Sequence, residues 1–284
     1  MPPSLDDLAA FEPFLIALHK AAAAETLPRF RTGLAVEDKG AANTVGGGYD
    51  PVTEADRGAE RAIRRLIAEH HPEHGVIGEE EGEDRPDAEW TWVLDPVDGT
   101  RAFVSGLPLW VTLIGLNHRG RPVLGSIGQP YIGELFIGHA AGSRLLSRGG
   151  ERPIRARPRR LAEATIAATD PHAYFEPAEL ARWTRLRERA RLVRLGGDGY
   201  LFALAALGGV DLVVETGLKR WDIEPCIPVI EGAGGVVTDW TGAPLSDAGL
   251  NARGHVLAAG DRACLDEALA VLTSPDLGGG GARR

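Results

Sequence analysis

Acidic residues follow short apolar stretches at several places in this 284-residue chain. The segment WTWVLDPVDGT, residues 90–100, runs from residues suited to a buried strand into two aspartates, Asp95 and Asp98. Aspartate, proline and glycine are common in turns, so the segment can be interpreted as a strand followed by a tight turn. It can also be interpreted as a cation site at the carboxyl end of a strand, because hard cations such as Mg²⁺ prefer oxygen ligands.

Three further acidic stretches favour the cation site. They are TEAD (53–56), GEEE (78–81) and RWD (220–222), each at an expected strand end or helix start. A phosphatase that uses two metal ions needs several carboxylates that converge on one point. After the second aspartate of DPVDGT, Gly99 and Thr100 open a helix whose free amides can receive a phosphate.

The elements that must position these residues fall into two halves. In the first half, the pattern predicts a helix over 4–24, a loop or hairpin over 33–50 and a second helix that begins at Thr53. Two strands, at GVIG and WTWVLDP, and antiparallel strands over 109–139 should follow. After residue 160, strands alternate with helices predicted at 176–190, 199–208 and 222–231, which indicates an α/β half. The predicted units are an α+β half over 1–150, an α/β half over 151–273 and a disordered tail over 274–284, within one compact functional unit.

Composition excludes several classes of protein. The formal charge of −9 argues against a general nucleic-acid binder. The basic run RPIRARPRR (152–160) has no aromatic partners and is expected to be a solvated connection. No stretch is apolar for long enough to span a membrane, and no secretory signal is evident. With only Cys226 and Cys264, the chain implies no disulfide framework and is expected in the cytoplasm.

The set TEAD, GEE, LDPVDGT and WD, in this order and spacing, resembles the signature of the inositol monophosphatase family over nearly the whole chain. Members of this family are Mg²⁺-dependent, lithium-sensitive phosphatases. The resemblance implies a layered α-β-α-β-α fold, Mg²⁺ as cofactor with two or three ions in each active site, and a small phosphate monoester as substrate. Family members are commonly homodimers, and neither nucleic acid nor membrane is an expected partner.

The resemblance also implies roles for individual residues. As metal ligands it assigns Glu79, Asp95, the carbonyl of Val97, Asp98 and Asp222. As catalytic residues that act on the attacking water it assigns Glu79, Thr100 and Asp56. To substrate binding it assigns Gly99, Thr100, Gly197, Asp198, Glu215 and Asp222. Lys39 matches a loop lysine near the site, in a loop made longer here by GGGYD.

The sequence segments around the motifs look most like those of the histidinol-phosphatase branch of this family. RAFVSG (101–106) and GGDGY (196–200) carry this likeness, whereas Trp221 is the residue that inositol-specific members have. Histidinol phosphate carries an ammonium group and an imidazole, with which Asp198 and Glu215 could pair. The predicted reaction is hydrolysis of L-histidinol phosphate in histidine biosynthesis, with inositol 1-phosphate or another small ester as the alternative substrate.

Other interpretations of the same residues remain open from the sequence. Asp56 fits a helix capping box with Thr53, and Asp222 fits a helix cap. Glu80 and Glu81 are expected in solvent, although one could contact a weaker metal ion. A relative that binds a phosphate ligand without catalysis is the alternative from another class. GAGG (232–235) follows a helix and precedes a strand, the reverse of a dinucleotide site.

Overall fold

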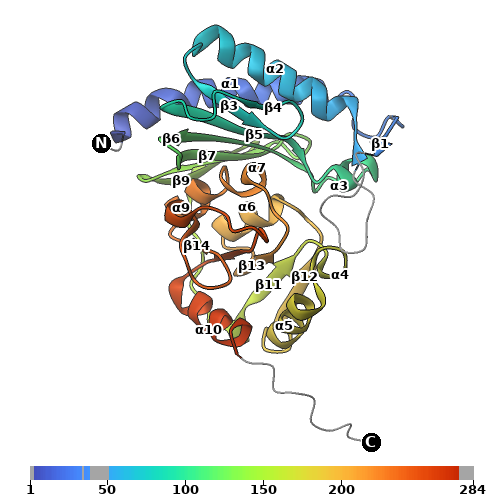
Figure 1. The fold of residues 1–284 in the computed structure, drawn as a ribbon, viewed down its shortest axis with the longest axis vertical. Coiled ribbons are helices and arrows are strands. Elements are labelled where there is room, and N and C mark those ends of the chain that lie inside the picture. The colour runs from blue at the N-terminus through green and yellow to red at the C-terminus, as the bar shows by residue number, and fades with distance from the viewer. Residues whose placement is uncertain (1–2, 34, 39–50, 275–284) are drawn as a thin grey trace, which may run out of the picture.

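Helices and sheets alternate in layers through the molecule (Figure 1). The computed structural model describes residues 3–33, 35–38 and 51–274. From one side to the other, the layers are helices α1 and α2, an eight-stranded sheet, a central group of helices, a five-stranded sheet, and helices α5 and α10. This is the layered α-β-α-β-α arrangement that the family resemblance implied. Lys39, the GGGYD segment and residues 275–284 of the tail lie outside the described residues.

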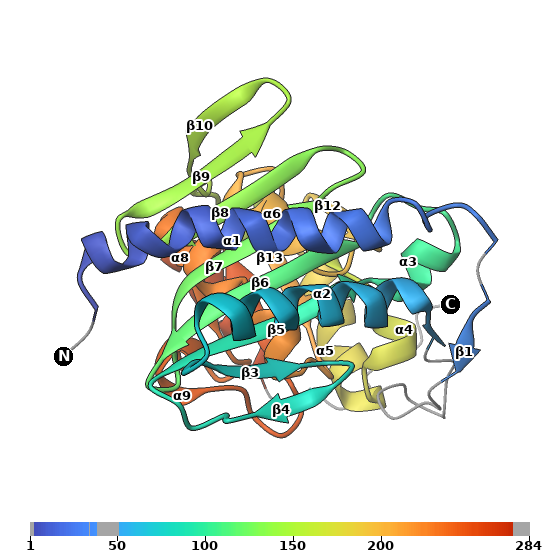
Figure 2. The same ribbon diagram turned by 90° about the horizontal axis from the view of Figure 1, so that it is seen from above.

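The outer helices of the first half begin where their capping residues predict. In α1 (Leu5–Thr26) the side chains of Ser4 and Asp7 form a capping box, and in α2 (Glu54–His70) Thr53 and Asp56 do the same. Figure 2 shows both helices side by side across one face of the eight-stranded sheet. Their apolar residues share one buried cluster with strand residues such as Trp92.

The eight-stranded sheet carries the predicted antiparallel strands. Its strand order is β10-β9-β8-β7-β6-β5-β3-β4, and among its pairs only β3 with β5 is parallel. The strands are β3 (Gly75–Gly78), β4 (Gly82–Asp84), β5 (Trp90–Asp98), β6 (Val111–His118), β7 (Arg121–Gln129), β8 (Glu134–His139), β9 (Gly142–Ser147) and β10 (Gly150–Ile154). A short pair, β1 (Glu37–Asp38) with β2 (Pro51–Val52), lies outside this sheet.

The five-stranded sheet belongs to the second half and is mixed. Its order is β12-β11-β13-β15-β14, with β11 parallel to both of its neighbours and the other pairs antiparallel. The strands are β11 (Thr165–Ala168), β12 (Leu192–Leu195), β13 (Leu212–Glu215), β14 (Val236–Thr238) and β15 (Val256–Ala259). The helices of this half include η1 (Leu161–Glu163), α4 (Pro171–Tyr174), α5 (Pro177–Arg187), α6 (Tyr200–Ala206), α9 (Leu245–Ala248) and α10 (Arg262–Leu272).

Most residues of the basic run over 152–160 are exposed, as its composition predicts, but parts of the run also have structural roles. Its first residues complete β10, so the eight-stranded sheet extends to Ile154, beyond the predicted boundary at 150. Arg157 then forms a two-pronged ion pair with the buried Asp211, with nitrogen–oxygen distances of 2.9 and 3.0 Å. The segment therefore holds the connection against the second sheet, and the division into halves stays a prediction.

Among the described residues, no helix is both long and apolar enough to cross a membrane.

The single helix predicted over 222–231 is wrong, because the structure has two short helices there. They are α7 (Arg220–Ile223) and α8 (Ile227–Gly232). A proline inside a continuous helix lacks an N–H and clashes with the preceding turn. The break places Pro228 in the first turn of α8, where no N–H is required.

Three glycines allow this broken segment to lie directly on the eight-stranded sheet. Gly115, Gly125 and Gly138 are register partners across β6, β7 and β8. A Cβ on Gly125 would lie 2.0 Å from the carbonyl oxygen of Pro225, and one on Gly138 would lie 2.4 Å from Cα of Val229. The close approach of the two backbones thus requires glycine, and it joins the central helices to the first sheet.

We predict that Gly125→Ala destabilises the fold by about 2 kcal/mol, because the added methyl group would force the Pro225 backbone away from the sheet. Urea unfolding measures this change. Gly149→Ala is the matched control, since the nearest atom to its Cβ would be Ser147 Oγ at 3.6 Å. Equal unfolding midpoints for the two variants would contradict the close packing.

Candidate active site

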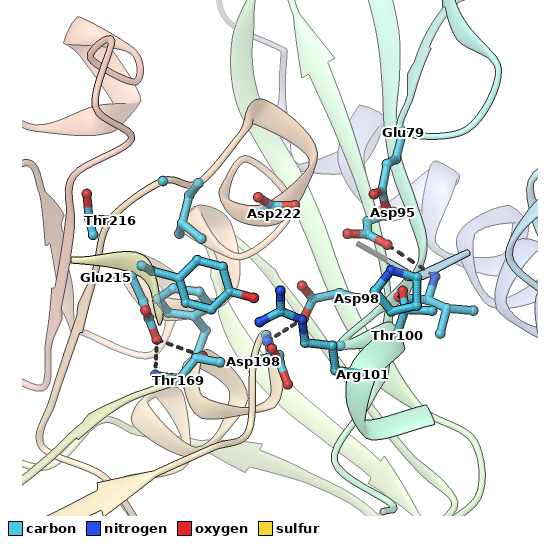
Figure 3. A pocket seen from close by; sticks show the side chains of 18 residues that line it. Glu79, Asp95, Asp98, Thr100, Arg101, Thr169, Asp198, Glu215, Thr216 and Asp222 are labelled. Atoms are coloured by element: carbon cyan, nitrogen blue, oxygen red, sulfur yellow. Dashed lines mark hydrogen bonds between the residues drawn. The ribbon is translucent and has the colours of Figure 1, made fainter. Parts of the chain in front are cut away.

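A pocket lies where strands from both sheets end (Figure 3). Strands β3 and β5 of the first sheet and β11 and β13 of the second run toward it with their carboxyl ends. Ligand sites in α/β proteins commonly lie at this end of the strands. The lining consists of Pro51, Glu79, Asp95, Val97, Asp98, Gly99, Thr100, Arg101, Thr169, Tyr174, Asp198, Gly199, Phe202, Glu215, Thr216, Gly217, Leu218 and Asp222.

Three aspartates form the centre of this pocket. Each of Asp95, Asp98 and Asp222 offers a carboxylate oxygen, and these oxygens lie within 4.8 Å of one another. Burial raises the pKa of Asp95 well above its ordinary value, and the charge of Glu79 raises it further. Burial also raises the pKa of Asp98. A set of closely spaced oxygen donors without nitrogen or sulfur fits a hard divalent cation, which would offset this repulsion.

An irregularity in β5 brings the first two aspartates to the same side. Asp95 pairs with Leu113 of β6 and Asp98 pairs with Val111, so β5 has one residue more than β6 between these positions. In a regular strand, residues three positions apart point to opposite faces, and one extra residue restores them to one face. The strand therefore continues through Asp98, where the sequence predicted a turn after Asp95.

Asp56 reaches the pocket through Thr100. The Thr100 hydroxyl lies 3.2 Å from Oδ1 of Asp56 and 3.0 Å from the Val97 carbonyl oxygen, so it can donate to either. The other oxygen of Asp56 accepts hydrogen bonds from the Thr53 amide and hydroxyl, at 2.9 and 2.6 Å. The helix cap and the contact with Thr100 thus coexist on one carboxylate. Burial raises the pKa of Asp56, although the hydrogen bonds from Thr53 and Thr100 lower it in part.

The turn before α6 contributes Asp198 from the second half. Asp198 has a left-handed backbone, with φ 44°, and its neighbour Gly199 donates its N–H to Oδ2 of Asp98. Gly99, at the start of α3 (Thr100–Val104), lies so close that a Cβ there would be 2.9 Å from Oδ2 of Asp198. Burial raises the pKa of Asp198 to about 6. Gly197 is part of the same turn but not of the pocket lining, and its role in substrate binding stays a prediction.

Glu215 closes the opposite side of the pocket at the end of β13. It is fully enclosed and accepts hydrogen bonds from the Thr169 amide and hydroxyl, at 2.7 and 2.9 Å. Burial raises the pKa of Glu215 to about 8. Across from it, the Arg101 guanidinium lies 5.1 Å from the centre of the Tyr174 ring.

Asp222 and Glu79 complete the predicted set. Asp222 is not the N-cap residue of α7, which is Lys219. It lies inside the first turn of this helix, and its carboxylate accepts the Lys219 N–H at 2.7 Å. The backbone N–H of Glu79 donates to the Leu94 carbonyl at 3.2 Å, which extends the pairing of β3 with β5. Both side chains line the pocket, as Figure 3 shows.

Sequence reasoning missed several residues of the lining. Thr169 directly follows β11, and its place at the carboxyl end of a strand was a usable signal. Arg101 directly follows the acidic motif. Tyr174 belongs to the short helix α4, whose start is marked in the sequence by Asp170 as N-cap and Pro171 as first helical residue.

A second group of metal-type side chains lies on the far end of α2. His71, Glu73 and His74 bring one ligand atom each within 4.8 Å. However, Trp92 Nε1 donates to Nδ1 of His74 at 3.1 Å, so the neutral His74 ring carries its proton on Nε2. Neither nitrogen then has a free lone pair for a metal, and this group does not fit a metal site.

Comparisons with known proteins agree with the fold and the pocket. The sequence model of the inositol monophosphatase family matches residues 7–273. The chain is 42% identical over 228 residues, 78% of its length, to the chloroplastic bifunctional phosphatase IMPL2 of Arabidopsis thaliana, and the match spans 65% of that plant protein. It is 36% identical over 192 residues to the histidinol-phosphatase of Chlorobaculum parvum, covering 68% of this chain and 73% of the relative.

A solved structure shows the same architecture. The inositol monophosphatase of Zymomonas mobilis superposes with a TM-score of 0.79 at 38% identity, covering 93% of this chain and 98% of that one. The chain therefore belongs to the inositol monophosphatase family, a family of phosphatase hydrolases. The resemblance that the motifs indicated is confirmed.

The raised pKa of Glu215 predicts how stability depends on pH in the metal-free protein. At pH values between 4.5, the ordinary pKa of glutamate, and about 8, the carboxyl group of Glu215 is deprotonated in the unfolded chain and protonated in the folded protein. The free energy of unfolding should therefore fall as pH rises through this window, by up to about 1.4 kcal/mol per pH unit. Urea unfolding in EDTA at several pH values measures the slope. Glu215→Gln should reduce it, and an unchanged slope in this variant would contradict the assignment.

Proposed function

We propose that the protein is a Mg²⁺-dependent phosphomonoesterase that hydrolyses L-histidinol phosphate to L-histidinol and phosphate. The observation that carries this proposal is the convergence of Asp95, Asp98 and Asp222 in one pocket, next to further acids from the second half. Inositol 1-phosphate is the alternative substrate, favoured by the likeness to the Zymomonas mobilis inositol monophosphatase and by Trp221.

The residues that would hold the metal are Glu79, Asp95, the Val97 carbonyl, Asp98 and Asp222. Their donor atoms are all oxygens, which suits Mg²⁺ better than a softer ion. The family's pattern predicts two or three ions. When bound, Mg²⁺ makes a water molecule more acidic near neutral pH and stabilises the negative charge of the leaving oxygen.

The proposed reaction is direct displacement at phosphorus, in which the chain orients the attacking water. Thr100, held by Asp56, and the carboxylate of Glu79 accept hydrogen bonds from this water and direct its oxygen. The amides of Gly99 and Thr100 bind the phosphate. No covalent phospho-enzyme is required, and the described pocket lining contains neither serine nor cysteine. Cys226 is buried, and burial raises its pKa well above the ordinary value.

Substrate choice is proposed to depend on the acids of the second half. Histidinol phosphate is cationic at the end away from its phosphate. Asp198 and Glu215 both line the pocket on the side away from Asp95, and a cation bound beside them would favour their ionised forms and pair with them. The relative from Chlorobaculum parvum, named a histidinol-phosphatase, supports this choice. A cytoplasmic location and a homodimer belong to the same proposal.

The direct test is phosphate release from histidinol phosphate and inositol 1-phosphate side by side, with Mg²⁺ and with EDTA. We expect activity only with Mg²⁺ and a preference for histidinol phosphate of roughly a hundredfold in kcat/KM, equivalent to ~2.7 kcal/mol. The opposite preference would move the protein to the inositol branch. Activity on neither ester would contradict both substrates.

We also predict that Asp198→Ala and Glu215→Ala raise KM for histidinol phosphate by about tenfold or more, because each removes a partner of the cationic end. A small ester without a cationic group, such as p-nitrophenyl phosphate, serves as the comparison, and its kinetics should change little. Steady-state kinetics with both esters separate the two effects. Equal losses on both would show that these acids do not select the substrate.

A further inference from the structure

A fully buried carboxylate on α2 takes no part in the mechanism above. Glu60 has no exposed surface and lies one helical turn after Asp56. Residues four apart on a helix share one face, so both carboxylates point from α2 toward the first sheet. A buried carboxylate is costly unless its oxygens are paired, and Glu60 is therefore expected to have a structural or functional task.

The partners of Glu60 are the backbone amides that directly follow Glu79. Its Oε2 accepts the N–H of Glu80 at 2.9 Å, and its Oε1 accepts the N–H of Glu81 at 3.0 Å. Arg64, one turn further along α2, donates from Nε to Oε1 at 2.8 Å. Hydrogen bonds to an ionised acceptor are stronger than neutral ones, so these contacts fix the peptide planes after Glu79.

The residue before Glu79 also bears on this contact. A Cβ on Gly78 would lie 2.1 Å from Oε1 of Glu60, so only glycine leaves room for the carboxylate there. Arg64 donates in addition to the Gly82 carbonyl, at the far end of the same turn. Hydrogen bonds from the side chains of Glu60 and Arg64 thus connect the turn over 79–82 to α2.

We propose that Glu60 is a positioning residue that orients Glu79 toward the metal and thereby sets metal affinity. The inference rests on the proposed function, in which Glu79 is a metal ligand. Helix α2 then serves the pocket through two carboxylates one turn apart. Asp56 holds Thr100, and Glu60 holds the turn that carries Glu79.

Glu60→Gln tests this inference with little change in shape. The amide has one acceptor oxygen, so one of the two backbone N–H groups would face an NH₂ group and lose its partner. Substitutions of residues that orient metal ligands typically cost about 10- to 100-fold in metal affinity. We expect a loss in this range for Mn²⁺, measured by calorimetric titration of the purified protein without substrate.

Glu25→Gln is the control, since Glu25, near the end of α1, pairs with Arg29 four residues later at 2.8 Å. Thermal unfolding in EDTA is measured for both variants. Weaker Mn²⁺ binding for Glu60→Gln alone, with unfolding temperatures close to the control, supports positioning. Unchanged Mn²⁺ affinity with a lowered unfolding temperature would show a purely structural role and overturn the inference.

Arg64→Gln keeps the test decisive if Glu60→Gln fails to fold. It leaves the carboxylate but removes one of its partners, and Mn²⁺ affinity should fall by a smaller factor, about three- to tenfold. Affinity equal to that of the unmodified protein would overturn the inference. If the unmodified protein itself binds no Mn²⁺, the metal site of the proposed function fails, which is a different result from equal affinities.

Discussion

Repulsion between enclosed carboxylates is the constraint on which the rest of this structure depends. Asp95, Asp98 and Asp222 approach one another within 4.8 Å, and burial together with neighbouring negative charge raises the pKa of Asp95 and Asp98. Such an arrangement is unfavourable unless protons or a cation compensate it. A divalent cation would compensate this repulsion, and the proposed chemistry depends on such a cation.

The fold overcomes this repulsion by packing its two halves closely. Asp95 and Asp98 belong to the first sheet, whereas Asp222 lies in α7, the first part of the broken helical segment that lies on the glycines of β6, β7 and β8. Gly199 adds an N–H from the second half to the carboxylate of Asp98. Backbone contacts between the halves therefore determine the spacing of the acids, and no single element carries the complete site.

Sequence reasoning predicted what local chemistry determines. The capping residues Ser4 and Thr53 begin their helices as expected, and the acidic motifs lie at strand ends or helix starts. Pro228 was a local signal for the break between α7 and α8, because proline is unfavourable inside a continuous helix. The extra residue in β5 depends on its pairing with β6, so the local pattern did not show it. The contact of Glu60 with the turn after Glu79 joins residues 20 positions apart and likewise required the structure.

The most direct measurement of the central claim is calorimetric titration of the unmodified protein and Asp95→Asn with Mg²⁺, without substrate. If the converging carboxylates hold the cation, the unmodified protein binds Mg²⁺ and the variant binds it at least tenfold more weakly, because a central ligand loses its charge. Thermal unfolding should show a larger rise in unfolding temperature with Mg²⁺ for the unmodified protein than for the variant. Equal Mg²⁺ affinity in both proteins would contradict the account.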